Sequence, residues 1–461
     1  MPLIIPANTL STGGYEVANS CRFNRGDQPN LSRTLGTPTN SKIWTFSFWY
    51  KRNPGTSQMV INSESSKSYM YFVSDLFSIE QYVSSQEYLL KTARVFRDPS
   101  AWYHIVVAMD TTQGTDTNRL KLYVNGTQET VFTTATYPAQ DLVTNFNSAV
   151  AHVISLGGTN ALDGYLAEVC LIDGTAYAAS DFGEFDEDSP TIWKPKNVSG
   201  LTFGNNGFYF DFEDSSNLGN DANGGTDWTV ANLAATDQST DTPTLNYPTL
   251  NPLIGAISSL TISEGNLNMV ATDANYRSLP STMAATAGKW YAEFKAVSGF
   301  ATEDASVGIY RADNTFVATT GLGNFTSGTT WSYGSGGLVR TSAATDDTEA
   351  TYTDGDIIQV AMDLDNLKLY FGKNNTWINS GDPESGATGT GAYTIINAAP
   401  KEFYNFAAAT ISSKLWSCNF GSPSYANSSD AADENGYGAF EYAPPSGYYA
   451  MNSANLAEFG G

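Results

Sequence analysis

Hydrophobic and polar residues alternate in two similar segments that lie far apart in the chain. In RLKLYVNG (Arg119–Gly126), Leu120, Leu122 and Val124 share one face of an extended backbone. NLKLYFGKNN (Asn366–Asn375) repeats the same alternation. A period of two predicts a half-buried strand of an antiparallel sheet in each segment.

Each of these strands follows an apolar run that ends in aspartate. The runs are HIVVAMD (His104–Asp110) and IIQVAMD (Ile357–Asp363). Each strand is followed by residues that tolerate the positive φ of tight turns, Asn-Gly at 125–126 and Asn-Asn at 374–375. The pattern therefore predicts two similar hairpins, one in each half of the chain.

Other short apolar segments separated by turn residues predict more strands. They include WTFSFWYKR (Trp44–Arg52), GYLAEVCLID (Gly164–Asp173) and GKWYAEFKA (Gly288–Ala296). No amphipathic pattern is long enough for a helix of four turns. Short strands at this spacing favour an all-β fold of two antiparallel β-sandwiches.

Composition supports this fold class and excludes some partners. Aromatic residues make up 13% of the chain and charged residues 15%, with a formal net charge of −24. Such a negative field repels nucleic acid and anionic membranes. No segment has the ~20 apolar residues of a membrane helix, and residues 1–10 lack the basic start of a signal peptide. Three widely spaced cysteines predict no disulfide framework.

The strands carry a resemblance to two known families. WTFSFWYKR, WYHIVVAMD, RLKLYVNG and GYLAEVCLIDG resemble the laminin-G-like branch of the concanavalin A-like lectin/glucanase superfamily. GKWYAEFK, SVGIY, QVAMDLDNLKLYFGKN and LWSCNFG are similar to a SPRY domain. Both families are jelly-roll sandwiches. The resemblance implies a laminin-G-like domain at 1–190, a partly folded connector at 191–255, a SPRY-like domain at 256–421 and a C-terminal extension at 422–461.

The junction and the C-terminal end resemble structural proteins of tailed bacteriophages. The similar stretches are LIDGTAYAASDFGEFDEDSPTIWKPK, NGFYFDFEDSSNLGNDANG and EYAPPSGYYAMNSANLAE. The resemblance implies a fibre-like virion protein, made in the host cytoplasm and displayed on the particle. Other virion proteins and host-surface polysaccharide are the expected partners, and a homo-oligomer, with a trimer favoured, is expected from the fibre role.

Catalytic patterns are missing, so we expect no enzyme activity and no catalytic residues. Retaining glucanases need paired glutamates about 5–5.5 Å apart, but GEFDEDS (Gly183–Ser189) lacks the E-x-D-x-x-E spacing. His104, inside an apolar strand, is expected to be structural. Zinc-peptidase, serine-hydrolase and NTPase motifs are absent.

We expect no cofactor, although one loop has residues that calcium prefers. The segment DFEDSSNLGNDANGGTD (Asp211–Asp227) is rich in carboxylates and Asn, but it lacks the EF-hand spacing. Its alternative interpretation is a set of turns in which Asx side chains hydrogen-bond the backbone.

Sugar binding needs aromatic rings for the apolar sugar face and polar side chains for the hydroxyl groups. In SPRY domains, loops at one edge of the sandwich form the ligand surface. The matching segments contain five candidate ligand-binding residues: Tyr310, Trp331, Tyr333, Arg340 and Trp377. Packing inside the sandwich or against a neighbouring subunit is the alternative role for the tryptophans.

The sequence therefore predicts a non-enzymatic, fibre-like virion protein that recognises a host-surface glycan. A capsid decoration or head-fibre protein without receptor binding remains an alternative. A glycan-degrading enzyme of the glucanase branch is a further alternative, which the missing glutamate pair disfavours.

Overall fold

A computed structural model describes residues 14–53, 55, 57–64, 67–254, 258–300, 305–312, 319–324, 330–341, 344–396 and 402–461. The N-terminal residues behind the signal-peptide expectation lie outside this set. Contacts divide the chain between Thr244 and Leu245 into two compact units. We call the part before this boundary the first unit and the part after it the second unit.

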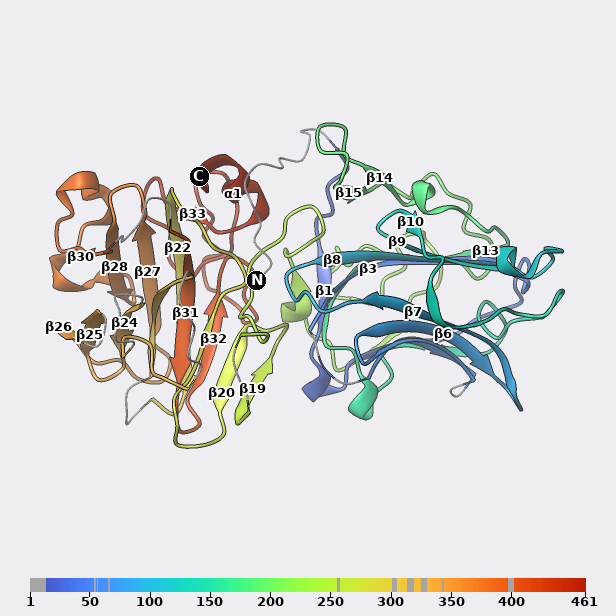
Figure 1. Cartoon of the computed structure of the whole chain (residues 1–461), viewed down its shortest axis with the longest axis horizontal. Coiled ribbons are helices and arrows are strands. Elements are labelled where there is room, and N and C mark those ends of the chain that lie inside the picture. Colours follow the sequence, from blue (N-terminus) through green and yellow to red (C-terminus); the bar gives the residue numbers. More distant parts are fainter. Residues whose placement is uncertain are drawn as a thin grey trace. The chain divides into compact units, whose positions relative to one another are not determined.

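The first unit is a sandwich of two antiparallel sheets, seen as two facing layers in Figure 1. The β3 sheet has the order β10 (Thr127–Gln128), β9 (Leu120–Val124), β8 (Trp102–Asp110), β3 (Ile43–Arg52), β13 (Gly164–Asp173), β1 (Ser20–Phe23) and β18 (Gln238–Ser239), and β16 (Phe208–Phe210) also pairs with β13. The β5 sheet has the order β11 (Phe132–Thr136), β7 (Gln86–Val95), β6 (Leu76–Tyr82), β5 (Ser68–Val73), β4 (Gln58–Ser63), β12 (Ala151–Ile154), β2 (Asn30–Thr34) and β17 (Thr229–Ala231). A hairpin of β14 (Gly183–Phe185) and β15 (Trp193–Pro195) is separate.

Aromatic residues from alternate positions fill the space between these two sheets. From β3, the buried residues Trp44, Phe46, Phe48 and Tyr50 all join one core cluster with residues of the opposite sheet. The period-two alternation in WTFSFWYKR therefore corresponds to the core face and the outer face of β3.

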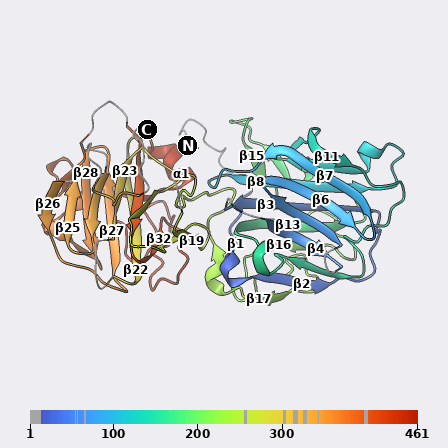
Figure 2. The ribbon, with the colours of Figure 1, turned by 60° about the horizontal axis from the view of Figure 1, so that its bottom comes forward.

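The second unit is also a sandwich of two sheets (Figure 2). The β22 sheet has the order β19 (Leu260–Ser263), β20 (Asn268–Ala271), β32 (Leu415–Asn419), β22 (Lys289–Ser298), β27 (Ile357–Asp363), β28 (Lys368–Lys373) and β29 (Thr376–Trp377); β30 (Tyr393–Thr394) pairs with β28, and β33 (Tyr449–Ala450) pairs in parallel with β22. The β23 sheet has the order β21 (Arg277–Pro280), β31 (Tyr404–Thr410), β23 (Ser306–Arg311), β24 (Thr330–Gly334), β25 (Leu338–Thr341) and β26 (Ala344–Thr348).

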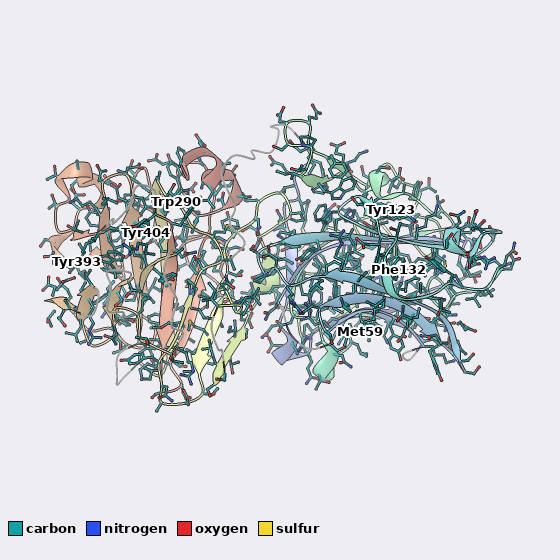
Figure 3. All side chains as sticks on the ribbon, viewed as in Figure 1. Met59, Tyr123, Phe132, Trp290, Tyr393 and Tyr404 are labelled. Atoms are coloured by element: carbon teal, nitrogen blue, oxygen red, sulfur yellow. The ribbon has the colours of Figure 1, made fainter. Side chains whose placement is uncertain are left out.

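The core of the second unit lies between these sheets, where Trp290 of β22 and Tyr404 of β31 are buried (Figure 3). A further cluster covers the other side of the β22 sheet. In it, Phe440 and Tyr448 of the C-terminal segment pack on Tyr291 and Tyr370. The C-terminal segment is therefore an additional layer of this unit.

Helices are short among the described residues. The one α-helix, α1 (Ser453–Phe459), is capped by Asn452, whose side chain accepts a hydrogen bond from the backbone N–H of Asn455. The 3-10 helices are η1 (Arg25–Asp27), η2 (Asp116–Asn118), η3 (Gly158–Asn160), η4 (Ala179–Asp181), η5 (Ala235–Asp237), η6 (Ile378–Ser380) and η7 (Pro383–Thr388). In the described part of the chain, no helix has the length and apolar character needed to cross a membrane.

Both predicted hairpins are present. Strands β8 and β9 pair with Val107 opposite Leu122, and β27 and β28 pair with Val360 opposite Phe371. The all-β, two-sandwich prediction is thus confirmed. Cys21, Cys170 and Cys418 are buried free thiols.

The segment predicted as a connector folds with the first unit. Within residues 191–255, strands β15, β16, β17 and β18 all precede Thr244, and three of them join the two large sheets of that unit. The C-terminal extension predicted from residue 422 contributes β33 and α1 to the second unit.

Candidate functional site

The outer face of the β3 sheet is covered by the first unit's own chain. Tyr15 and Trp193 pack over Trp49 and Trp102, which point outwards from the sheet. A second cluster on this face contains Phe182 and other residues from the segment that follows β13. This face is therefore occupied by protein.

His104 lies within this covering layer. The Trp193 indole N–H donates to His104 Nδ1 at 2.9 Å, so His104 Nε2 carries the proton and donates to Ser47 Oγ at 2.9 Å. The Trp49 ring stacks on the imidazole with centroids 4.6 Å apart. Burial lowers the pKa of His104 to about 3. With both nitrogens and one ring face in contact, His104 is a packing residue.

The outer face of the β5 sheet presents two tyrosines to solvent. In β5, Met70 and Phe72 point into the core, whereas Tyr69 and Tyr71 alternate with them and are half-buried. The two tyrosine rings lie 6.2 Å apart at 80° to each other. In the described part of the chain, no apolar cluster packs over them. In Figure 1, strands β6 and β7 of the same sheet bend away from β3 and β8.

Polar side chains flank the two tyrosines on the adjacent strands. Tyr69 lies between Asn62 and Glu80, and Tyr71 lies opposite Ser78. Asn62 and Ser78 are buried, so Glu80 is the accessible polar side chain of the three. Burial raises the pKa of Glu80 above its ordinary value. Burial, together with the nearby Glu80 carboxylate, also raises the pKa of Tyr71, so the tyrosine stays a neutral hydrogen-bonding group.

This arrangement of aromatic and polar groups suits a sugar. Aromatic rings receive the apolar C–H face of a sugar, and amide, hydroxyl and carboxylate groups pair with its hydroxyls. Sequence analysis did not identify this face. Its signal is the alternation in SYMYFV (Ser68–Val73), which places the two tyrosines on the side opposite Met70 and Phe72.

The loop considered for calcium uses its carboxylates internally. Asp221 Oδ1 accepts the backbone N–H of Tyr209 at 3.0 Å, and Asp227 Oδ1 accepts that of Asp221 at 3.0 Å. Arg33 Nη1 lies 3.8 Å from Asp221 Oδ2 and donates to the carbonyl of Thr226 at 2.8 Å. A guanidinium group thus supplies positive charge to this loop. Within the described residues, no three His, Cys, Asp or Glu side chains are grouped as a metal ion requires.

We expect the replacement Arg33→Met to lower the free energy of unfolding by about 1–2 kcal/mol, because the buried Asp221 carboxylate loses its cationic neighbour. Urea unfolding measures this loss. Millimolar calcium or EDTA should leave the melting temperature of both proteins unchanged. A rise with calcium in either protein would contradict this account of the loop.

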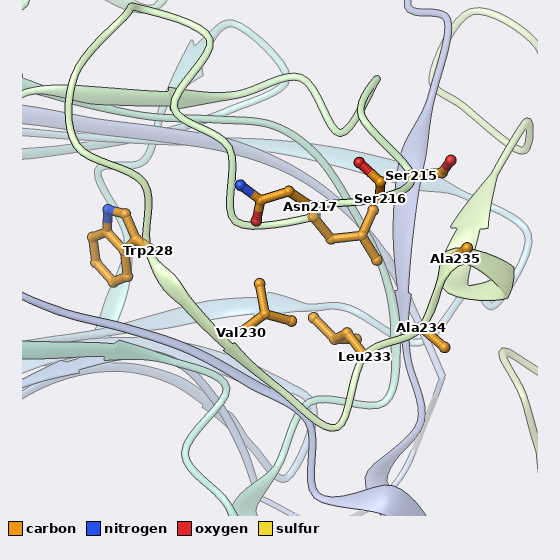
Figure 4. Close-up of a pocket in the computed structure, with 9 residues that line it drawn as sticks. Ser215, Ser216, Asn217, Trp228, Val230, Leu233, Ala234 and Ala235 are labelled. Atoms are coloured by element: carbon orange, nitrogen blue, oxygen red, sulfur yellow. The ribbon is translucent and has the colours of Figure 1, made fainter.

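A groove of about 460 Å³ opens beside the same loop in the first unit (Figure 4). It is lined by Ser215, Ser216, Asn217, Leu218, Trp228, Val230, Leu233, Ala234 and Ala235. In Figure 4, Asn217 and Ser216 lie on one side, with Val230 and Leu233 on the other.

Three of the predicted ligand residues are inside the second unit rather than on a loop. Trp331 and Tyr333 belong to strand β24 and are 1% and 0% exposed. The Trp331 indole N–H donates to the carbonyl of Thr394, and Tyr310, on β23, is 1% exposed. The prediction that these three residues lie on the surface is wrong, because they belong to strands that neighbouring strands and loops enclose.

The other two predicted residues, Arg340 and Trp377, are half-buried and lie on different sheets. Arg340 is in β25, opposite Ser332 in the β23 sheet. Trp377 is in β29 of the β22 sheet and packs on the cluster that holds the C-terminal segment. The five predicted residues therefore do not converge on one site.

Comparison with known proteins finds a family match within the first unit. Residues 26–179 match the model of the concanavalin A-like lectin/glucanases superfamily. No curated protein matches the chain.

Solved structures with a similar fold include the SPRY domain of human HERC1, with 16% identity over 37% of this chain and 96% of that chain and a TM-score of 0.29. Another human SPRY domain has 11% identity over 35% of this chain and 94% of that chain, with a TM-score of 0.25. A Bacteroides ovatus protein, provisionally described as carbohydrate binding, has 13% identity over 47% of this chain and 58% of that chain, with a TM-score of 0.34.

Proposed function

We propose that this chain is a fibre-like structural protein of a tailed-phage virion that recognises a host-surface glycan. The observation that carries the proposal is the open Tyr69–Tyr71 face. It lies within residues 26–179, which match a superfamily that includes lectins. A polysaccharide chain across this face would contact the two rings and the Glu80 carboxylate.

The virion setting is supported by the phage-like stretches at the junction and the C-terminal end. The net charge of −24 disfavours nucleic acid and anionic membranes as partners and suits a displayed protein. Other virion proteins and further copies of the chain, in a trimer, complete the proposed assembly. The lectin-like fold favours binding without catalysis.

Glycan binding is tested with the variants Tyr69→Ala and Tyr71→Ala on arrays of bacterial surface polysaccharides. Each variant should lose at least tenfold in affinity, because a ring that contacts the sugar contributes about 1.5 kcal/mol or more. The matched control is Tyr123→Ala, which removes a half-buried tyrosine from the opposite layer (Figure 3) and should bind normally. Equal loss in all three variants, or no glycan bound by the unaltered chain, would contradict the proposal.

Position on the particle is tested by immunogold electron microscopy of purified phage. Label at fibre tips supports the proposed role, and label spread over the head favours the decoration alternative. New reducing ends after incubation with a bound polysaccharide would instead support the enzyme alternative.

A further inference from the structure

The groove lies at the free edge of the β5 sheet. Strand β17 (Thr229–Ala231) is the last strand of this sheet and pairs on one side with β2. On the other side, the backbone N–H of Trp228, the residue before β17, donates to the carbonyl of Gly219 at 2.8 Å. One wall of the groove is formed by residues 215–218, just before Gly219, and the other by residues from Trp228 to Ala235. Its walls are therefore an open strand edge and a polar loop.

One wall of the groove offers aliphatic side chains and no accessible aromatic ring. Val230 and Leu233 are half-buried and provide aliphatic contacts, whereas Leu218 is only 4% exposed. The one aromatic residue, Trp228, is only 2% exposed, so its ring face is not available for stacking. The polar wall, with Ser215 and Ser216, offers hydroxyl groups at the rim.

Carboxylates outnumber basic side chains around the groove. The segment Asp211–Asp241 contains seven carboxylates and no Lys or Arg: Asp211, Glu213, Asp214, Asp221, Asp227, Asp237 and Asp241. Three of these carboxylates form ion pairs: Asp221 with Arg33, Asp237 with Arg22 and Asp241 with Lys51. The other four have no Lys or Arg ion pair among the described residues. A ligand with positive charge is therefore favoured by this field.

We propose that the groove binds an extended basic segment of a partner protein, which adds as a strand to the free edge of β17. In this binding mode, backbone hydrogen bonds provide affinity, and pockets for alternate side chains provide specificity. An aliphatic side chain of the segment contacts Val230 and Leu233, and flanking Lys or Arg residues lie near Asp214 and Asp227. Because β17 spans about 10 Å, a segment of about five to seven residues is sufficient.

The test uses the full chain and a fluorescent seven-residue peptide of alternating valine and threonine with lysine at both ends. Fluorescence anisotropy should show binding at least tenfold tighter than that of the same peptide with terminal glutamates. A third peptide, N-methylated at alternate residues, keeps its charge but cannot complete a strand ladder. It should bind at least tenfold more weakly.

Two variants locate the binding site. Ala234→Trp fills the groove from an exposed position and should reduce peptide affinity at least tenfold, whereas Ala176→Trp, at an exposed position away from the groove, should not. Asp214→Asn keeps the acceptor that Ser216 uses, and Asp227→Asn keeps one of the two acceptors that Asp221 and Asn217 use. The double variant should remove the preference for lysine. Unchanged melting temperatures show that the variants are folded.

Equal binding of the N-methylated peptide, or normal binding by Ala234→Trp, would overturn the proposal. Failure of every peptide to bind would also overturn it. If Ala234→Trp instead abolishes glycan binding or self-association, the occupant is a sugar or a second copy, and the proposal is wrong. These readouts are independent of the Tyr69–Tyr71 face.

Discussion

Replacing Asp241 with alanine is expected to lower the free energy of unfolding of the first unit by about 3–5 kcal/mol. Asp241 Oδ2 lies 2.5 Å from Lys51 Nζ, and the two side chains are 2% and 1% exposed. The Trp102 indole N–H donates to Asp241 Oδ1 at 3.2 Å. Burial lowers the pKa of Lys51, while Asp241 opposes this by stabilising the ammonium group. Without the carboxylate, a buried ammonium has lost its counter-charge, which explains the large loss.

The control is the double variant Lys51→Met with Asp241→Leu. Apolar residues of similar volume often replace a buried ion pair with little or no loss of stability. The double variant should therefore be much more stable than Asp241→Ala. Calorimetry and urea unfolding measure both proteins. A loss below about 1 kcal/mol in the single variant would show that the pair is solvated and the structural account is wrong.

A second large effect is expected from pH in the second unit. Glu293 is 0% exposed and accepts the backbone N–H groups of Glu441 and Tyr442 at 2.9 and 2.8 Å, and the Tyr291 hydroxyl at 2.9 Å. Burial raises the pKa of Glu293 from 4.5 to about 7, although these three donors act in the opposite direction. The folded state therefore holds a proton that the unfolded state has released between pH 4.5 and 7.

Stability from this group is fully present below pH 4.5 and is lost as pH rises to about 7. At about 1.4 kcal/mol for each pKa unit, the loss is about 3 kcal/mol. Glu293→Gln cannot ionise and should remove this slope. Calorimetry from pH 4.5 to 8 measures it.

The matched control is Glu168→Gln in the first unit. Glu168 is also buried, accepts the hydroxyls of Tyr15 and Tyr209, and has its pKa raised to about 7 by burial. Its replacement should alter the pH slope of the first unit and leave that of the second unit unchanged. An unaltered slope in Glu293→Gln would assign the pH dependence of the second unit to other groups.

Alternation along single strands predicted the sandwiches well, because it depends on local geometry alone. Leu120, Leu122 and Val124 face the core as expected. The opposite faces were predicted to be in solvent, yet Tyr370 is 1% exposed under the C-terminal segment. The covering segments are rich in Pro, Gly and Asn and have no period, so the sequence does not show which faces they cover.

The candidate sites were harder to predict for the same reason. Trp331 and Tyr333 alternate with Ser332, which is a strand pattern, but the resemblance to SPRY domains assigned this segment to a ligand-binding loop. The alternation of Tyr69 and Tyr71 is visible in the sequence. Whether their face is open depends on where residues distant in the chain pack. Local alternation in the sequence does not predict this long-range packing.

The C-terminal layer of the second unit has a consequence for biosynthesis. Strand β33 pairs with β22, and the amides of Glu441 and Tyr442 bind Glu293, so late residues complete a sheet that begins much earlier in the chain. On the ribosome, the β22 sheet therefore exposes Tyr291 and Tyr370 until these residues emerge. A translating cell must keep this unfinished surface from aggregating, and premature termination before residue 440 leaves it exposed permanently.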